Sequence, residues 1–293
     1  MISTMYSNKY DEIKGMWTGK SYIILKRLGA GGVGEIYLVE DKEGRRLALK
    51  LSDDMISITK EFNFLCRLKH KNFIPKAFDL DDFIKQGKIY HYFTMEYIEG
   101  NNLKSVIRNS HLNFETKLGI VSIIIEAIRQ INEAGYIYTD LKHENIMIDE
   151  KNKLIKLIDL GSLVEIGNTV KEYTPMYDRL CWGKGRRIAD LSYQIFVIAI
   201  LFMSMLLNRS LDPDKEKLEM AIKSLRKRKV PKKVFEVIMG CIEGKIKDCE
   251  TLYNEIGCAV DCCKKHPDGL NVALNILISV LSLIITATIF AYR

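Results

Sequence analysis

The stretch "LKRLGAGGVGEIYLV", Leu25 to Val39, places a cluster of glycines between two runs in which apolar and polar residues alternate. Glycine weakens a strand, so such a cluster marks a tight turn or a close approach of the backbone to another group. Gly29, Gly31 and Gly34 have the spacing G-x-G-x-x-G, which is typical of loops that bind phosphate. An ordinary glycine-rich hairpin is the alternative.

The residues after the last glycine decide between two fold classes. A dinucleotide-binding fold needs a helix here, whereas residues 35–39 are rich in β-branched and aromatic residues and lack a capping residue. They predict a second antiparallel strand, so that the loop folds over phosphates as a hairpin. Residues 45–52, "RRLALKLS", predict a third strand, which the turn at 41–44 joins to the second.

Beyond these strands, the periodicity changes from strands to helices along the chain. Residues 57–70 have apolar residues at helical spacing, and residues 74–83 and 88–98 predict two further strands. Helices are then predicted at 103–109, 114–134 and 190–207, followed by shorter helices to about residue 265. This order predicts an α+β chain with a small antiparallel β lobe that carries one helix and a larger, mainly α lobe.

Composition is that of an ordinary globular chain. The 293 residues are 47% hydrophobic and 28% charged, which excludes a disordered or fibrous protein. The net charge of +7 favours an anionic partner, such as a nucleotide, a membrane surface or nucleic acid, without choosing among them. The seven cysteines form no spaced framework, so we expect free thiols in a reducing compartment.

The end of the chain predicts a membrane anchor. No charged residue lies between Asp268 and Arg293, and a helix of that length spans about 36 Å, enough for a hydrocarbon core of roughly 30 Å. We expect a transmembrane helix at 270–292, and the flanking Lys264 and Lys265 place residues 1–268 in the cytoplasm. The apolar helix at 190–207 is instead predicted to be buried in the larger lobe.

The most specific stretch is "YIYTDLKHENIMID", residues 136–149. It resembles the catalytic loop H-R-D-L-K-x-x-N of the eukaryotic-like, or Hanks-type, serine/threonine protein kinases, including those of bacteria. "KLIDLGS", residues 156–162, is similar to the D-F-G motif of that family, with leucine in the middle. The resemblance runs from about residue 21 to residue 256 and implies a bilobal protein-kinase-like fold that uses ATP and Mg²⁺.

The resemblance implies roles for the residues at the matching positions. Asp140 would orient the substrate hydroxyl and accept its proton, Lys142 would neutralise charge on the transferring phosphoryl group, and Asn145 and Asp159 would bind magnesium. Lys50 would hold the phosphates of the nucleotide and pair with Glu61 on the following helix.

The resemblance also implies a nucleotide pocket. Met95 would border the adenine, the backbones of Glu96 and Ile98 would hydrogen-bond it, and Met147 would form its floor. The full set of nucleotide-binding residues expected on this basis is Gly29, Ala30, Gly31, Gly32, Val33, Gly34, Ile36, Ala48, Lys50, Met95, Glu96, Ile98 and Met147.

Two departures from the family pattern are visible. Tyr138 and Thr139 replace His-Arg before Asp140, which suggests activity that does not depend on a phosphate on the following segment. Arg179, Leu180 and Cys181 stand where the family has A-P-E. Thr174, by contrast, aligns with the threonine that contacts Asp140 and Lys142, and Asp190 aligns with the aspartate that supports the catalytic-loop backbone.

The basic run "KSLRKRKVPKK", residues 223–233, is open to three interpretations. It can be a solvated helix face, a contact with anionic lipid near the predicted anchor, or a nucleic-acid contact. Because no aromatic residues that could stack on bases interleave the run, no nucleic-acid partner is expected.

The sequence therefore predicts a membrane-anchored serine/threonine protein kinase that transfers the γ-phosphoryl group of ATP to a protein hydroxyl. Its expected parts are an N-terminal extension at 1–20, an N-lobe at 21–98, a C-lobe at 99–265 and the anchor at 270–292. The alternatives are a pseudokinase scaffold, which the missing A-P-E motif favours, and a small-molecule kinase of the same fold. The sequence carries no indication of the oligomeric state.

Overall fold

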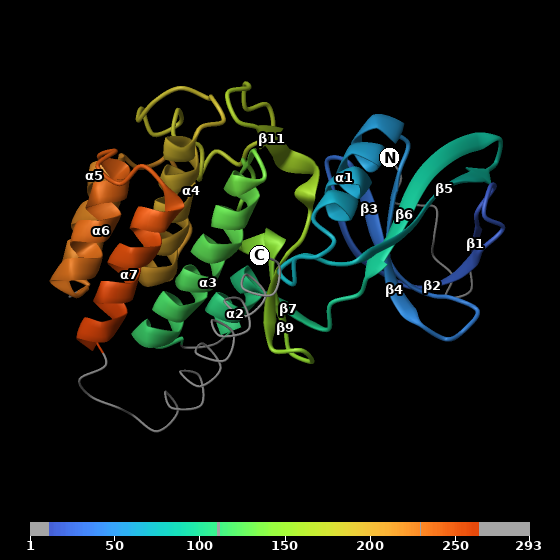
Figure 1. Ribbon diagram of the computed structural model, residues 1–293, viewed down its shortest axis with the longest axis horizontal. Coiled ribbons are helices and arrows are strands. Elements are labelled where there is room, and N and C mark those ends of the chain that lie inside the picture. The colour runs from blue at the N-terminus through green and yellow to red at the C-terminus, as the bar shows by residue number, and fades with distance from the viewer. Residues whose placement is uncertain (1–11, 110–111, 229, 264–293) are drawn as a thin grey trace, which may run out of the picture. The chain divides into compact units, whose positions relative to one another are not determined.

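The computed structural model describes residues 12–109, 112–228 and 230–263, and its backbone contacts define two compact units (Figure 1). The first unit comprises the residues up to Asn101 together with Met147–Gly161. The second comprises Asn102–Ile146 and the residues from Ser162 onward. The predicted domain bounds, 21–98 and 99–265, stay predictions. The sequence does not predict that residues 147–161 belong to the first unit.

A six-stranded antiparallel sheet with the order β1-β2-β3-β4-β6-β5 forms most of the first unit. Its strands are β1 Glu12–Lys14, β2 Ser21–Gly31, β3 Gly34–Glu40, β4 Arg46–Ser52, β5 Ala77–Lys85 and β6 Lys88–Glu96. The single helix, α1 (Met55–Arg67), begins after Asp54, whose carboxylate accepts the N–H groups of Ile56 and Ser57. The predicted small antiparallel β lobe with one helix is thereby confirmed.

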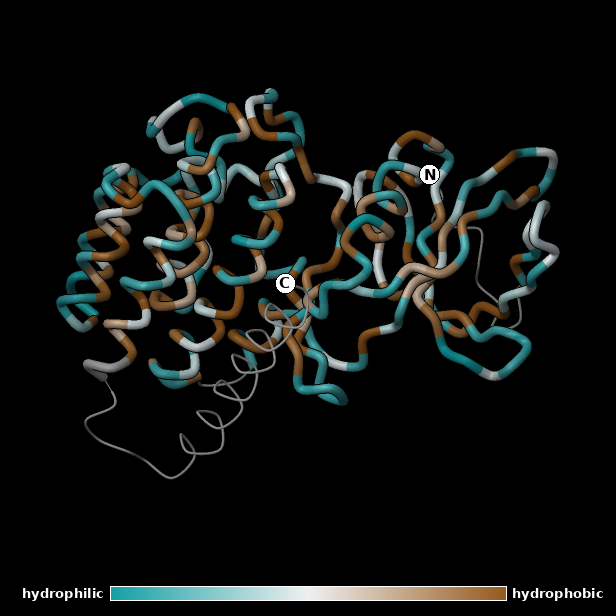
Figure 2. The backbone as a smooth tube through the Cα atoms, in the orientation of Figure 1, coloured by the Kyte–Doolittle hydropathy of each residue, from teal (hydrophilic) through white to brown (hydrophobic). Residues whose placement is uncertain are grey.

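One face of this sheet forms a hydrophobic core, as the alternation of apolar and polar residues along the strands predicts. Figure 2 shows this alternation as changes of colour along the strands. The buried residues of this core are Ile13, Tyr22, Ile24, Tyr37, Val39, Leu47, Leu49, Leu51, Phe83, Tyr90 and Tyr92.

The segment after β1 links the two edge strands of the sheet. The N–H of Met16 donates to the carbonyl oxygen of Asp82 in β5 at 2.9 Å. The carboxylate of Asp81 accepts the N–H of Trp17 at 3.0 Å and both the N–H and the hydroxyl of Thr18, at 2.8 and 2.6 Å. The sheet therefore closes on itself, because groups that follow one edge strand satisfy the other.

A smaller sheet with the order β10-β9-β7 also lies largely in the first unit. It consists of β7 (Gly100–Asn102), β9 (Ile146–Asp149) and β10 (Leu154–Leu157). Asp159 lies two residues after the end of β10, and its backbone is in the left-handed region with φ +63°. A non-glycine residue in this region is uncommon and marks a constrained turn, so β10 delivers the Asp159 side chain in a fixed orientation.

The second unit is mainly helical. Its helices are α2 Leu103–Asn109, α3 Phe114–Glu133, α4 Leu191–Leu207, α5 Leu218–Lys227, α6 Lys232–Ile242 and α7 Cys249–Cys263, and a short ladder pairs β8 (Tyr136–Tyr138) with β11 (Leu163–Glu165). Every residue from Tyr193 to Leu207 is buried, and α3, α5, α6 and α7 all contact α4. The prediction that this apolar helix is a buried core element is confirmed.

Among the residues that the structure describes, none of the helices combines the length and apolar character that a membrane crossing requires. The predicted transmembrane helix at 270–292 lies outside the described residues.

Gly15 tests the closure of the first sheet. An ideal Cβ at this position would lie 2.2 Å from Oδ2 of Asp81 and 2.6 Å from the hydroxyl oxygen of Tyr92, and Asp81 is held by its hydrogen bonds. We expect Gly15→Ala to lower the free energy of unfolding by about 1–3 kcal/mol, because the added methyl group overpacks a filled space. Urea denaturation measures the change.

Gly257→Ala is the matched control for this substitution. It adds the same methyl group in helix α7, where an ideal Cβ meets no atom within 4 Å, so we expect unchanged or slightly higher stability. Equal stability of Gly15→Ala and the wild type would contradict the close approach.

Candidate active site

The glycine-rich loop lies in the first unit as the tip of the β2–β3 hairpin. Gly31 pairs with Gly34, which confirms a hairpin in place of a strand-to-helix turn. Gly34 has φ +138°, and an ideal Cβ there would lie 2.3 Å from the carbonyl oxygen of Leu51, so its packing requires glycine. At Gly29 and Gly32 a Cβ would meet nothing within 4 Å. Packing does not explain these two glycines, whereas backbone approach to a ligand does.

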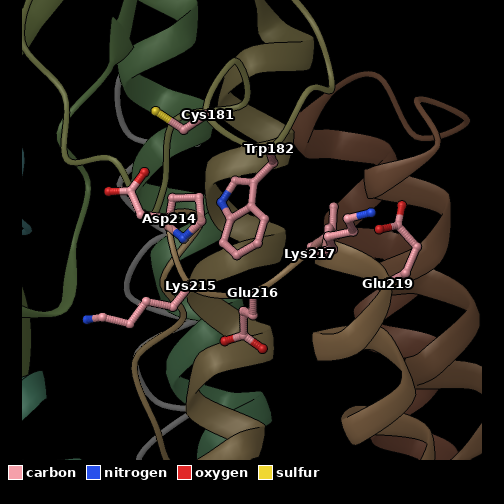
Figure 3. Close-up of a pocket in the computed structure, with 9 residues that line it drawn as sticks. Cys181, Trp182, Asp214, Lys215, Glu216, Lys217 and Glu219 are labelled. Atoms are coloured by element: carbon pink, nitrogen blue, oxygen red, sulfur yellow. The ribbon is translucent and has the colours of Figure 1, made fainter.

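Two cavities in the described part of the chain differ in their relation to this loop. A cavity of about 360 Å³ in the first unit is lined by Arg27, Ser52, Asp53, Asp54 and residues 30–35 of the loop. A cavity of about 410 Å³ in the second unit is lined by Cys181, Trp182 and residues 213–219 (Figure 3). The larger cavity contains none of the predicted site residues, so the polar contacts described below locate the chemistry better than cavity size does.

Lys50 is the centre of a buried charge cluster in the first unit. Its Nζ atom lies 2.5 Å from Oε2 of Glu61 on α1 and 3.0 Å from Oδ1 of Asp159. Lys50 is 5% exposed and Glu61 is 1% exposed. Burial opposes the charge on Lys50, but the carboxylates of Glu61 and Asp159 outweigh it and hold the lysine pKa above its ordinary value. The structure thus forms the predicted pair and adds Asp159 to it.

The residues expected around adenine all belong to the first unit. Ala48 on β4 is directly opposite Met95 on β6, and both are buried, as is Ile98. Met147 lies on β9 and is half-buried. The N–H of Glu96 donates to the carbonyl oxygen of Lys76 at 2.8 Å, so this group is already satisfied within the unit.

Sequence reasoning missed a second buried lysine in this unit. Lys156 on β10 is 4% exposed and donates to Oε2 of Glu96 at 2.8 Å and to the carbonyl oxygen of Ile74 at 3.2 Å. It ties β10, which precedes Asp159, to the end of β6. A lysine inside an apolar run, "KLIKLID", was the available signal.

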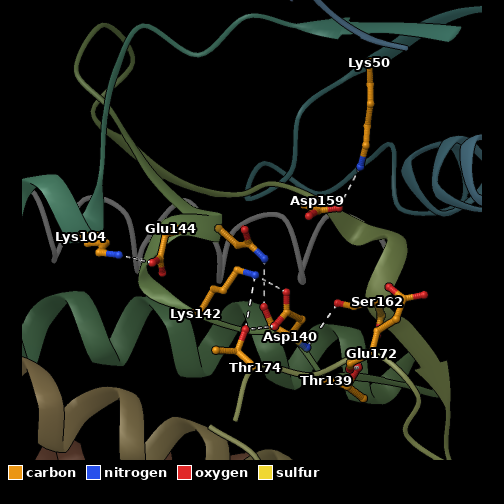
Figure 4. Close-up of polar contacts among 11 residues, drawn as sticks. Lys50, Lys104, Thr139, Asp140, Lys142, Glu144, Asp159, Ser162, Glu172 and Thr174 are labelled. Carbon is orange, nitrogen blue, oxygen red and sulfur yellow. Dashed lines mark hydrogen bonds and ion pairs between the residues drawn. The ribbon is translucent and has the colours of Figure 1, made fainter. Parts of the chain in front are cut away.

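Asp140 is the centre of a polar cluster in the second unit (Figure 4). The Nζ atom of Lys142 donates to Oδ2 of Asp140 at 2.5 Å, and the hydroxyl of Thr174 donates to Oδ1 at 2.6 Å. Nδ2 of Asn145 donates to the carbonyl oxygen of Asp140 at 3.0 Å. The predicted contacts of Thr174 with Asp140 and Lys142 are therefore present, and they orient the carboxylate from two sides.

The residues expected to bind Mg²⁺ have suitable chemistry. Asp159 offers a carboxylate that is 41% exposed, and Asn145 donates through Nδ2, which leaves Oδ1 as a ligand oxygen. Carboxylate and amide oxygens are the hard donors that Mg²⁺ prefers. Within the described residues, no cluster of three or more His, Cys, Asp or Glu side chains could hold a metal ion alone.

The support of the catalytic loop differs from the prediction. Asp190 caps α4 through the N–H of Tyr193 and pairs with Arg179 at 2.8 Å. Gln194, one helical turn later, accepts the N–H of Tyr138 at 2.7 Å and donates to its carbonyl oxygen at 3.4 Å. The role expected of Asp190 thus belongs to Gln194, because a neutral amide satisfies both buried backbone groups at once.

The region that lacks A-P-E contains its own charge pairs. Asp178 is fully buried and accepts Nε of Arg187 at 2.9 Å, the N–H of Cys181 at 3.1 Å and the hydroxyl of Tyr193 at 3.1 Å. Arg179 binds both carboxylate oxygens of Asp190, at 2.8 and 3.0 Å. These local pairs brace the end of the segment that carries Thr174.

His143 links the catalytic loop to two other elements. Its Nδ1 is hydrogen-bonded to the hydroxyl of Tyr177 at 2.9 Å and its Nε2 to the hydroxyl of Ser204 at 3.3 Å. The Ser204 hydroxyl donates to the carbonyl oxygen of Leu201, so Nε2 carries the imidazole proton and Nδ1 accepts from Tyr177. Burial lowers the pKa of His143 to about 4, so the ring is neutral at physiological pH.

Comparison with known proteins identifies the family. Residues 22–247 match the protein kinase domain, so the chain belongs to the protein kinase family. Membership of this family implies the use of ATP and Mg²⁺.

Several relatives are similar to parts of the chain. The serine/threonine-protein kinase YabT of Bacillus subtilis (strain 168) is 34% identical over 197 residues, which cover 66% of this chain and 57% of YabT. The serine/threonine-protein kinase PrkC of the same organism is 31% identical over 163 residues, 52% of this chain and 24% of PrkC. The probable serine/threonine-protein kinase zyg-1 of Caenorhabditis elegans is 27% identical over 154 residues, 50% of this chain and 21% of zyg-1. The matched region thus spans little more than half of YabT and about a quarter or less of the other two.

His143 generates a prediction about pH. The unfolded histidine binds a proton near pH 6.5 but the folded one only near pH 4, so stability falls as the pH decreases through this window. We expect the free energy of unfolding to fall by about 3 kcal/mol more between pH 6.5 and 4 in the wild type than in His143→Gln, which does not titrate. Denaturation at a series of pH values measures both slopes, and parallel slopes would contradict a neutral buried imidazole.

Proposed function

We propose that this chain is a serine/threonine protein kinase that transfers the γ-phosphoryl group of ATP to a protein hydroxyl. The observation that carries the proposal is the oriented Asp140 carboxylate, held by Lys142 and Thr174 in the second unit. The Lys50 cluster of the first unit supports it, because its residues match those that hold nucleotide phosphates in protein kinases.

In the proposed reaction each residue has a defined task. Asp140 orients the substrate hydroxyl and accepts its proton, while Lys142 offsets the charge that develops on the transferring group. Lys50, fixed by Glu61, binds the phosphates, and the loop at 29–34 supplies backbone N–H groups to them. Asp159 and Asn145 would hold Mg²⁺, which neutralises charge on the β- and γ-phosphates when bound.

The pseudokinase and small-molecule alternatives predict different outcomes. A scaffold has no need for an aligned Asp140, Lys142 and Thr174, whereas all three are hydrogen-bonded together here. The charge pairs of Asp178 and Arg179 also weaken the argument from the missing A-P-E motif, since the end of the segment is braced without it. If ATP is consumed but no protein is labelled, the result would instead indicate a small-molecule kinase.

Transfer of labelled γ-phosphate from ATP with Mg²⁺ tests the proposal. We expect the full chain to label itself or a generic basic protein, and Asp140→Asn to reduce the rate by about 10²–10⁴-fold, because the general base is lost. Asp214→Asn, which neutralises an exposed aspartate of the second unit, is the matched control and should stay near the wild type. If the protein binds ATP but transfers no phosphate, the pseudokinase scaffold would be the better interpretation.

We further propose that residues 270–292 anchor the protein in a membrane with the kinase domain in the cytoplasm. The uncharged tract of residues 269–292 supports this. So does the basic run at 223–233, whose Lys233 contacts Glu255 at 2.5 Å and so lies beside the middle of α7, the helix that leads to the tract. Exposed basic residues near an anchor favour anionic headgroups.

Membrane fractionation tests the anchor. We expect the full chain expressed in bacteria to stay in the membrane pellet after an alkaline carbonate wash. Val280→Arg with Ile284→Arg should release it, because each central arginine costs about 2.5–3.5 kcal/mol of insertion free energy. Ser279→Ala with Ser282→Ala is the matched control and should remain in the pellet. Release of the wild-type chain by the same wash would contradict the anchor.

A further inference from the structure

Thr139 stands directly before Asp140 and is 1% exposed. Its hydroxyl oxygen lies 2.8 Å from the carbonyl oxygen of Ser162 and 2.8 Å from that of Glu172. The Ser162 carbonyl also receives the backbone N–H of Thr139, at 3.4 Å. The Thr139 hydroxyl has one proton and can donate it to only one of these two carbonyl oxygens. Because the Ser162 carbonyl already accepts a backbone N–H, we assign the hydroxyl proton to the carbonyl oxygen of Glu172.

These contacts join both ends of one segment to the catalytic loop (Figure 4). At its start, the hydroxyl of Ser162 accepts the N–H of Asp140 at 3.3 Å. Near its end, Glu172 precedes by two residues Thr174, whose hydroxyl donates to the Asp140 carboxylate. Thr139 therefore closes a ring of hydrogen bonds that begins and ends at Asp140.

The neighbours of this ring add further support. β11, which follows Ser162, pairs with β8, which precedes Thr139, with Leu163 opposite Tyr138. Tyr173, between Glu172 and Thr174, packs its ring under the guanidinium of Arg187, 4.0 Å from the ring centroid. Arg187 is itself held by Asp178. All of these groups are neutral or already paired, so nothing in the ring needs an added charge.

We propose that the Thr139 hydroxyl is an internal tether that holds residues 162–174 in the arrangement needed for catalysis, with no phosphate on that segment. Segments of this kind are ordered in other kinases when a new phosphate pairs with arginine. A buried threonine cannot pair with a phosphate, but its hydroxyl supplies one hydrogen bond that orders the segment permanently. Thr139 is thus a positioning residue, and this inference rests on the proposed kinase function.

The test compares Thr139→Val, which keeps the shape but removes the hydroxyl, with Thr139→Ser, which keeps the hydroxyl. We expect Thr139→Val to lower kcat about tenfold while KM for ATP stays within about twofold, because the Lys50 cluster is not touched. Amide hydrogen exchange of residues 163–173 should accelerate by at least about tenfold. Thr139→Ser should restore both quantities to within about threefold of the wild type.

Thr169→Val is the matched control. Thr169 lies in the same segment but is exposed, so this variant loses a hydroxyl that can be phosphorylated and none that tethers. We expect wild-type kcat from Thr169→Val and from wild-type protein treated with phosphatase. Loss of activity in both would overturn the proposal, as would wild-type exchange in Thr139→Val.

The exchange measurement separates this proposal from the proposed function. If the wild type binds ATP but transfers no phosphate, the kinase function fails, whereas faster exchange of 163–173 in Thr139→Val still supports the tether. If the wild type is active and Thr139→Val is equally active and equally protected from exchange, the kinase function stands and the tether fails.

Discussion

The buried pair of Lys50 and Glu61 is the constraint on which the first unit depends. Removing two charges from water costs several kcal/mol per ion, and only close geometry offsets this cost. The pair therefore adds little stability, but it persists only while β4 and α1 keep their relative position. Its third member, Asp159, is fixed by a left-handed backbone and reached through β10, whose Lys156 is anchored to Glu96. Ion pairs thus fix the positions of Lys50, Glu61 and Asp159 in the first unit.

The second unit orders its catalytic loop mainly with neutral groups. Gln194 holds the backbone of Tyr138, Thr139 holds the segment at 162–172, and His143 is a neutral bridge to Tyr177 and Ser204. Buried neutral hydrogen bonds avoid the desolvation cost of ions and have strict geometry. The charged residue at the centre, Asp140, therefore sits in a rigid frame in which few other charges compete with Lys142.

The elements of the fold were largely predictable from local pattern, because strand alternation and helical spacing follow from which faces are buried. Lys50, Glu61, Asp140 and Asp159 were predictable because the stretches around them resemble motifs of the protein kinase family, and that resemblance assigns a role to each position. β1 was missed because three residues show no periodicity, and its role depends on distant partners such as Asp81. Gln194 was missed because no sequence pattern indicates which of two polar residues, one helical turn apart, reaches the buried backbone.

The loss of A-P-E shows how a family contact can be replaced locally. A buried charge that keeps no partner would destabilise the unit by about 3–5 kcal/mol, so a lost partner must be replaced or the charge removed. Here Asp178 with Arg187 and Arg179 with Asp190 form within a stretch of 13 residues. Arg187 also stacks on Tyr173, next to Thr174. The residues that support the segment therefore lie next to it in the sequence, and Thr139 of the catalytic loop supports the same segment through its hydroxyl.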